Sequence, residues 1–394
     1  DHINTCIGCN QACLDHAFVG KTASCLVNPE ACHETELKTT LLPEEQRLKL
    51  NVVGAGPAGC AFAIAASKMG HQVTLYDKDA RIGGQFHMAK RIPGKEEFHE
   101  TLRYFEKELE ANNVDVRLNT VISYDDMSHA NSDGVDKWIV ATGVNPRDPK
   151  IPGMDHPNVL TYIDVLKHKK PVGERVAIIG AGGIGFDVAE FLLYHDGQDR
   201  THSDVSVSHF WEEWGIDPTQ KQRGGLTGSP PTAQAKRQVH LMQRKKGKLG
   251  AGLGRTTGWI HRATLKMGNV NMINGVSYDS IDENGHLHFT RNGKQEVLEV
   301  DNIIMCAGQT PQRELHDKAV EAAGDDAADG LLPAKVYTIG GAFEAGELDA
   351  KRAIDMGTRL ALRIHEADVV PGKHKFQSPK SSEEKLFEAM RKFM

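Results

Sequence analysis

The sequence predicts an α/β fold with two Rossmann-like domains, and three observations support this prediction. The pattern G-x-G-x-x-G occurs at residues 54–59 and again at residues 180–185 of the 394-residue chain. A short apolar run precedes each pattern and a helix-forming run follows it, which is typical of a strand, a tight turn and a helix. The length is also sufficient for about two or three domains.

The composition argues against several classes of protein. With 39% hydrophobic residues and a mean hydropathy of −0.43, the chain can form ordinary cores but has no long uncharged apolar run that would span a membrane. A net charge of −6 provides no general basic surface for nucleic acid. The sequence starts at Asp1 without a signal-peptide pattern. We therefore expect a cytoplasmic protein, and a fragment of a longer one.

Four of the seven cysteines form the pattern C-x2-C-x3-C-x11-C, namely Cys6, Cys9, Cys13 and Cys25. Outside small secreted proteins, such spacing indicates metal ligation rather than disulfides. Four thiolates suit a [4Fe–4S] cluster or zinc. The uneven spacing favours the cluster, because structural zinc usually takes two C-x2-C pairs. Cys32 is a rival fourth ligand, which we interpret instead as a buried thiol nearby.

The first glycine pattern predicts a dinucleotide site. Gly54 permits the turn, Gly56 lets the backbone approach a pyrophosphate, and Gly59 lets the helix pack on the strand. The helix N-terminus supplies amide donors. The next predicted strand ends at Asp77, an acceptor suited to ribose hydroxyls. A tight turn without a ligand is the alternative.

Further segments after this site suit a flavoprotein. Residues 81–85 form a loop whose glycines allow close approach to a flat, bulky ring. Residues 95–110 have helical charge patterning, and residues 114–121 alternate as a strand does. Residues 137–143 form a strand that ends in a small-residue turn, again suited to a cofactor.

The second pattern, with Gly180, Gly182 and Gly185, predicts a second dinucleotide in its own domain. The following strand begins only at residue 238, after a polar stretch at 197–237. We interpret that stretch as a surface insertion with a small apolar anchor, since loops of this length tend to be functional or disordered.

A basic sequence follows the strand at residues 238–242. Arg244 and Lys245 occupy the place where an NAD site carries an acid. Removing the acid and adding cations meets the electrostatic requirement of a ribose 2′-phosphate, so the site favours NADP. A solvated basic loop is the alternative.

The remaining segments complete the two domains. Trp259 follows a glycine-rich loop and either lies in a nicotinamide pocket or anchors the core, while Cys60 and Cys306 are expected to be inert packing thiols. Asn-Gly turns at residues 284–285 and 292–293 predict a small antiparallel meander.

The cysteine motif and several further segments together resemble a known family. These segments are residues 53–59, 83–86, 92–95, 180–187, 243–245 and 258–262. They are similar to the bacterial NADPH-dependent 2,4-dienoyl-CoA reductases of the old-yellow-enzyme and trimethylamine dehydrogenase-like family. The resemblance covers about residues 3–364.

The resemblance implies a set of cofactor contacts. Cys6, Cys9, Cys13 and Cys25 would ligate the cluster, Arg244 and Lys245 would bind the NADP phosphate, and Trp259 would lie near the acyl substrate. Besides the three glycines of the first pattern, the implied FAD contacts are Ala58, Asp77, Gln85, Lys95, Ile122, Gly341, Leu348, Asp349 and Ala350. In this family a TIM barrel carries FMN, the dienoyl-CoA site and the catalytic acids, so we expect no catalytic residue in the present chain.

The expected architecture is a glutathione-reductase-like pair of domains behind a small iron–sulfur segment. The expected bounds are 1–45 for that segment, 46–170 and 296–370 for the FAD domain, 171–295 for the NADP domain and 371–394 for a tail. In the implied reaction, NADPH electrons pass through FAD and the cluster to FMN, where dienoyl-CoA is reduced. The alternatives are electron input to another enoate or a partner subunit, and a non-catalytic nucleotide-binding module.

Overall fold

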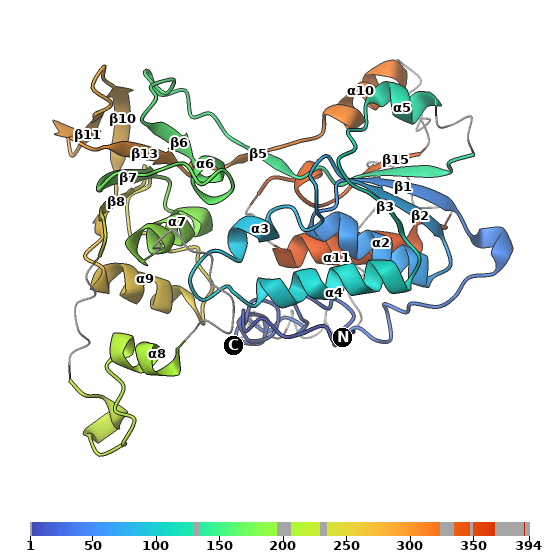
Figure 1. Cartoon of the computed structure of the whole chain (residues 1–394), viewed down its shortest axis with the longest axis horizontal. Helices are drawn as coiled ribbons and strands as arrows, with labels where there is room; N and C mark the ends of the chain where they lie inside the picture. Colours follow the sequence, from blue (N-terminus) through green and yellow to red (C-terminus); the bar gives the residue numbers. More distant parts are fainter. Residues whose placement is uncertain are drawn as a thin grey trace.

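Two parallel β-sheets with covering helices make up the protein, as the α/β prediction requires. The computed structural model describes residues 2–129, 134–194, 206–228, 235–323, 335–346, 350–366 and 390. Figure 1 shows the two sheets in separate lobes, with the N-terminal segment running beneath the first lobe. No helix within the described ranges is long and apolar enough to cross a membrane.

The first sheet has the strand order β15-β4-β1-β2-β3, and all neighbouring strands are parallel. Its strands are β1 (Lys49–Val53), β2 (Gln72–Tyr76), β3 (Asp115–Arg117), β4 (Lys137–Val140) and β15 (Val336–Thr338). Three helices lie against one face of this sheet (Figure 1): α2 (Pro57–Lys68), α4 (Phe98–Ala111) and α11 (Ala350–Arg363). Together they enclose the first core.

The second sheet is also parallel, in the order β6-β13-β7-β8-β9. Its strands are β6 (Val159–Thr161), β7 (Arg175–Ile179), β8 (Gln238–Met242), β9 (Asn271–Ile273) and β13 (Asn302–Met305). Along β7 the side chains alternate between two cores. Val176 and Ile178 pack toward α7 (Gly183–Tyr194), whereas Ala177 and Ile179 pack toward the antiparallel meander.

The domain bounds suggested by the pairing differ from those expected at residues 170 and 296. β6 and β13 lie outside 171–295, yet both are hydrogen-bonded members of the second sheet. The crossing between domains is made instead by β5 (Val144–Pro146) and β14 (Gln309–Pro311), which pair antiparallel. The reason is that β6 and β13 complete the edge of the second sheet beside β7, a pairing set by contacts distant in sequence.

Shorter elements fill the remainder. The meander consists of β10, β11 and β12, as the Asn-Gly turns predicted. The bounds of these and the other elements are α1 (Leu14–Ala17), η1 (Glu44–Gln46), α3 (Phe86–Ala89), α5 (Tyr124–His129), α6 (Tyr162–Leu166), α8 (Val207–Trp214), η3 (Arg223–Gly225), α9 (Gly258–Met267), β10 (Val276–Ile281), β11 (Leu287–Arg291), β12 (Lys294–Leu298), α10 (Glu314–Ala323) and η5 (Gly340–Ala342).

The described residues of the 197–237 stretch contain the helix α8 and the short helix η3. Helix α8 exposes Val207, Phe210 and Trp211, and Figure 1 shows it beyond α9. The buried Asp217 carboxylate accepts hydrogen bonds from the backbone amides of Thr219 at 2.9 Å and Gln222 at 2.8 Å. The expected tail, apart from Met390, lies outside the described residues.

A close backbone contact joins α2 to α11. A Cβ atom on Gly357 of α11 would overlap the carbonyl oxygen of Ala58 in α2. The absence of a side chain therefore allows these two helices to cross at the start of α2, where the first glycine turn ends.

We expect Gly357→Ala to lower the free energy of unfolding by about 1–3 kcal/mol, because the added methyl group must push the two helix backbones apart. Urea denaturation measures the change. Gly346→Ala is the control, since a Cβ there would come no closer than 3.7 Å to Glu344. An equally stable Gly357→Ala protein would show that the two helices separate without cost.

Candidate active site

One large cleft, of about 2460 Å³, connects the two domains and the cysteine segment. Its lining includes both glycine turns, the loop after β8, and Ile7, Gly8 and Cys9 of the N-terminal segment. Three parts of the chain that are far apart in sequence therefore share one cleft.

The first glycine turn joins β1 to α2. Gly54 has a φ of 108°, and a Cβ atom there would overlap the carbonyl oxygen of Ala141. A Cβ on Gly59 would overlap the carbonyl oxygen of Gly54, whereas a Cβ on Gly56 would meet no atom within 4 Å. Gly56 and Ala58 line the cleft. The start of α2 is thus open to an anionic ligand, which its amides can bind.

The second glycine turn repeats this geometry between β7 and α7. Gly180 has a φ of 113°, and a Cβ there would overlap the carbonyl oxygen of Cys306. A Cβ on Gly185 would overlap the carbonyl oxygen of Gly180, and Gly182 is open within 4 Å. Each turn therefore has the close packing and the open face that a dinucleotide pyrophosphate needs.

The carboxylate of Asp77 lies at the end of β2, beside the first turn. It accepts hydrogen bonds from the amides of Ala55 at 2.6 Å and Asp79 at 2.8 Å. Asp77 also lines the cleft. These two amides hold the carboxylate in place, and its remaining lone pairs can accept from ribose hydroxyls.

The other predicted FAD contacts divide into three groups. Gln85, Lys95, Gly341 and Ala350 line the cleft. Ile122 instead packs against the cluster around Tyr76 and Trp138 and does not line it. Leu348 and Asp349 lie outside the described residues.

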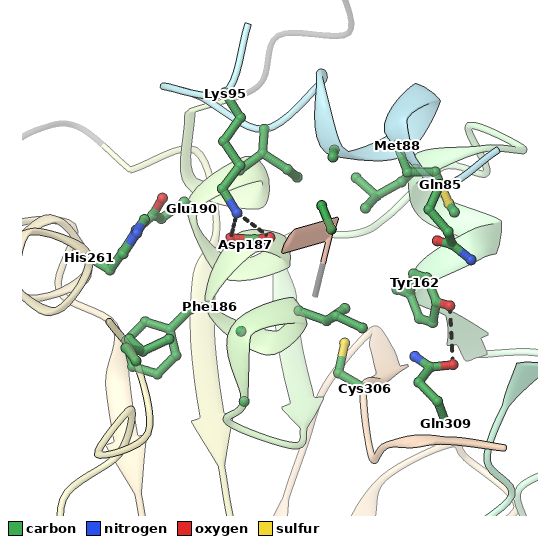
Figure 2. A pocket seen from close by; sticks show the side chains of 18 of the residues that line it. Gln85, Met88, Lys95, Tyr162, Phe186, Asp187, Glu190, His261, Cys306 and Gln309 are labelled. Atoms are coloured by element: carbon green, nitrogen blue, oxygen red, sulfur yellow. Dashed lines mark hydrogen bonds and ion pairs between the residues drawn. The ribbon is translucent and has the colours of Figure 1, made fainter. Parts of the chain in front are cut away.

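A pair of opposite charges spans the cleft between the domains. The Lys95 ammonium donates to both carboxylate oxygens of Asp187, each at 2.7 Å. Figure 2 shows this contact at the centre of the cleft, with Lys95 from the first domain and Asp187 from α7. The family resemblance implied a role for Lys95 but not for its partner, although Asp187 ends the segment 180–187 that carries part of the resemblance.

A second polar pair lies one helical turn further along α7. Glu190 Oε1 and His261 Nδ1 are 2.8 Å apart, and Glu190 is only 4% exposed. Burial raises the pKa of Glu190. The hydrogen bond to Glu190 raises the pKa of His261. Both side chains line the cleft (Figure 2); no sequence pattern indicated this pair, because α7 and α9 meet only in the fold.

On the opposite wall, three polar side chains meet at the crossing between domains. The hydroxyl of Tyr162 donates to Gln309 Oε1 at 3.3 Å, and Gln85 lies beside them (Figure 2). Burial raises the pKa of Tyr162, and the side chains of Gln309 and Gln85 oppose this effect. Both domains and the connecting strand β14 therefore contribute to this wall.

The loop after β8 places a group of cations at the edge of the cleft. The side chains of Arg244, Lys245, Lys246 and Lys248 are exposed, line the cleft, and form no ion pair with any described residue. The Gln243 side-chain amide donates to the carbonyl oxygens of Lys245 at 3.1 Å and Gly247 at 3.3 Å. These hydrogen bonds to backbone carbonyls hold the loop in place, so its charged side chains remain available to bind an anion.

Trp259 is not the core anchor that was one of its two expected positions, and its place beside the nicotinamide stays a prediction. Its side chain is 57% exposed, so it does not anchor a core, and it is not part of the cleft lining, although the neighbouring Ile260 and His261 are. The helix α9 directs it outward because a half-turn separates it from the residues that face α7.

The four motif cysteines occupy one neighbourhood. Burial raises the pKa of Cys9, and the thiols of Cys25, Cys13 and Cys6 raise it further by their charge. Cys32 exerts no such effect and is exposed rather than buried, which corrects the expectation for that thiol. It has a φ of 62°, and its amide donates to Glu34.

The donor chemistry and the proximity of these four thiols fit an iron–sulfur cluster. Their side chains are not gathered into coordination geometry: within the described ranges, no group of three or more His, Cys, Asp or Glu side chains is arranged to hold a metal ion.

The cysteine segment is docked on both domains. Asp15 Oδ1 accepts hydrogen bonds from the Thr256 amide at 2.9 Å and the Thr256 hydroxyl at 2.8 Å, in the second domain. Arg103 of α4 donates to the carbonyl oxygen of Ile3 at 3.0 Å. Leu26 and Val27 are buried in the first core. The segment therefore forms a third wall of the cleft.

The remaining two thiols, Cys60 and Cys306, are buried, as the sequence indicated, and burial raises the pKa of each well above its usual range. Their inertness stays a prediction. All seven cysteines belong to the described residues and are free thiols. The cleft lining contains Cys9 and Cys306 but no adjacent cysteine pair.

Comparisons with known proteins agree with this architecture. A family model described as pyridine nucleotide-disulphide oxidoreductase matches residues 48–357. Among solved structures, a complex of 2-naphthoyl-CoA reductase with 2-naphthoyl-CoA superposes with a TM-score of 0.71 and 25% identity, covering 92% of this chain and 46% of that one. The thioredoxin reductase of Lactococcus lactis shares the fold, with a TM-score of 0.54 and 17% identity over 81% of this chain and 98% of that one.

Curated relatives extend the comparison. A metal reductase of Desulforamulus reducens is 31% identical over 317 residues, covering 80% of this chain and 45% of the relative. A dimethylamine dehydrogenase of Hyphomicrobium sp. is 28% identical over 388 residues, covering 93% of this chain and 49% of the relative. The chain thus spans about half the length of these two relatives.

We expect the substitutions Cys6→Ser, Cys9→Ser, Cys13→Ser and Cys25→Ser each to abolish iron binding after anaerobic reconstitution with iron and sulfide, since each removes one thiolate of the set. Cys32→Ser is the matched control and should retain iron. Iron and acid-labile sulfide per chain are the measured quantities. Loss of iron in Cys32→Ser together with retention in Cys25→Ser would exchange the roles of these two residues.

Proposed function

Because the chain belongs to the pyridine nucleotide-disulphide oxidoreductase family, we propose that it is the electron-input part of an NADPH-dependent 2,4-dienoyl-CoA reductase, acting in the degradation of unsaturated fatty acids. The observation that carries this proposal is the shared cleft, which both glycine turns and Cys9 line. A donor site, a flavin site and a cluster segment are thereby adjacent.

Each group in the cleft has a defined task in this proposal. The first glycine turn and Asp77 bind FAD, and the second turn with Arg244 and Lys245 binds NADPH. When bound, FAD supplies the conversion of a hydride into single electrons, and a [4Fe–4S] cluster on the four motif cysteines carries them. Lys95 and Asp187 hold the two domains together where the two nucleotides would meet.

The direction of electron flow follows from the cysteines. Relatives with a redox disulfide can pass electrons to that disulfide, but the thiols that line this cleft are the single Cys306 and Cys9 of the metal-binding motif. Electrons therefore leave through the cysteine segment, toward FMN and the dienoyl-CoA site that the family carries on a TIM barrel outside these residues. The 2-naphthoyl-CoA reductase supports an acyl-CoA acceptor.

A second candidate is electron input to a different acceptor. The relatives include a metal reductase, a bilirubin reductase and a cinnamate reductase, so matching chains occur in proteins named for different acceptors. The part of the site described here serves either candidate, since the acceptor would bind elsewhere.

We expect the FAD- and cluster-loaded chain to oxidise NADPH with ferricyanide as acceptor and to lose its yellow-brown colour under anaerobic addition of NADPH. It should not reduce 2,4-dienoyl-CoA alone, because the proposal assigns that site to residues outside this chain. Stopped-flow absorbance and NADPH consumption measure both reactions. If NADPH is oxidised with neither acceptor, a non-catalytic nucleotide-binding module is favoured. Reduction of dienoyl-CoA by the chain alone would contradict the assignment of the substrate site.

We expect the double substitution Arg244→Ala with Lys245→Ala to weaken NADPH binding by at least about tenfold, since each hydrogen bond to a charged group contributes on the order of 1.5–3 kcal/mol. NADH binding should change by less than about twofold, because NADH has no 2′-phosphate. Lys294→Ala, an exposed cation on β12 outside the cleft, is the control. Equal losses for the two nucleotides would remove Arg244 and Lys245 from the phosphate site.

A further inference from the structure

We propose that Tyr278 is a third component of the phosphate site, and that its hydroxyl donates a hydrogen bond to the 2′-phosphate of the bound nucleotide. This inference rests on the proposed NADPH site and extends it to a residue on the meander, outside the strand-and-loop segment that sequence motifs identify.

The basic loop is attached to the segment that carries Tyr278. The Asn274 side-chain amide donates to the carbonyl oxygen of Gly247 at 2.7 Å, and the Gly275 amide donates to that of Lys245 at 3.2 Å. The Val276 amide donates to the carbonyl oxygen of Gln243 at 3.3 Å. The loop after β8 and the start of β10 therefore form one hydrogen-bonded unit.

Tyr278 has a hydroxyl group without a partner in this unit. The residue lines the cleft, while its ring packs against the core under the second sheet. The hydroxyl oxygen is buried and makes no hydrogen bond within the described part of the chain. Since buried polar groups are nearly always hydrogen-bonded, this hydroxyl is a candidate for satisfaction by a ligand.

The backbone geometry at this point also differs from a regular strand. Tyr278 pairs with Phe289 and Ser280 pairs with His288, so Asp279 is an extra residue and the register shifts directly after Tyr278. Bulges of this kind redirect side chains and are common beside active sites. Asp279 itself accepts a hydrogen bond from Thr290 at 2.8 Å, so its carboxylate is engaged on the meander.

The charges around the hydroxyl indicate which ligand it would bind. Burial raises the pKa of Tyr278, and the positive charge of Arg244 opposes this effect. The carbon chain of Lys246 lies beside Gly275, 3.4 Å from where a Cβ would be. A neutral donor at the start of β10, bonded through the backbone to the loop that carries Arg244, Lys245 and Lys246, matches a phosphate monoester, whose oxygens accept several hydrogen bonds at once.

The test uses Tyr278→Phe, which removes the hydroxyl and retains the ring. Isothermal titration calorimetry of the FAD-loaded chain with 2′,5′-ADP, which carries the 2′-phosphate without nicotinamide, reports the contact without turnover. We expect about a tenfold increase in its Kd, equivalent to about 1.4 kcal/mol, and an unchanged Kd for 5′-AMP. Tyr124→Phe, in α5 of the first domain, is the matched control and should bind both ligands as the unsubstituted protein does.

The outcomes separate this inference from the proposed function. If Tyr278→Phe binds 2′,5′-ADP normally while Arg244→Ala binds it weakly, the hydroxyl does not contact the phosphate but the NADPH site stands. If Tyr278→Phe weakens 2′,5′-ADP and 5′-AMP equally, the hydroxyl acts on the adenosine and the inference fails. If the Arg244 substitution also has no effect, the phosphate site itself is elsewhere, and the proposed nucleotide preference fails with it.

Discussion

The close contact between the first and third glycines of each turn is the constraint on which the rest of the structure depends. At residues 54–59 and 180–185, the helix backbone lies directly against the carbonyl oxygen of the first glycine. This contact sets the angle at which α2 and α7 leave their sheets. It also leaves the second glycine, Gly56 or Gly182, facing an open cleft. A side chain at the third position would move the helix start away and close the anion site.

The cleft also depends on how the two domains and the cysteine segment are held together. Lys95 and Asp187 join the two domains by charge, and Asp15 joins the cysteine segment to the second domain through Thr256. The side chains of Lys95 and Asp187 are partly buried, so salt screens their attraction less than that of a fully exposed ion pair. The electron transfer that we propose would require such fixed adjacency of the three parts.

The centre and the edge of the cleft differ in the charges of their side chains. The centre contains the ion pair of Lys95 with Asp187 and the hydrogen-bonded pair of His261 with Glu190. The edge contains the cations of the loop after β8, which form no ion pair within the described ranges. Side chains that are bonded to a partner of opposite character can position a neutral part of a ligand, but they do not attract an anion. The cations of the basic loop, in contrast, attract a phosphate. The site thus suits a ligand with its anionic end at the loop and its reactive end at the centre.

The sequence by itself determined the two glycine turns, the acid at Asp77, the basic loop at Arg244 and the cysteine motif, because each depends on residues close together in the chain. Only the tertiary structure decided that β6 and β13 join the second sheet, since strand pairing is made across about 140 residues. It alone brought Glu190 to His261 and Tyr278 to the basic loop, because side chains on different elements meet only after packing. The outward position of Trp259 likewise followed from which face of α9 packs on α7, a choice that local sequence did not reveal.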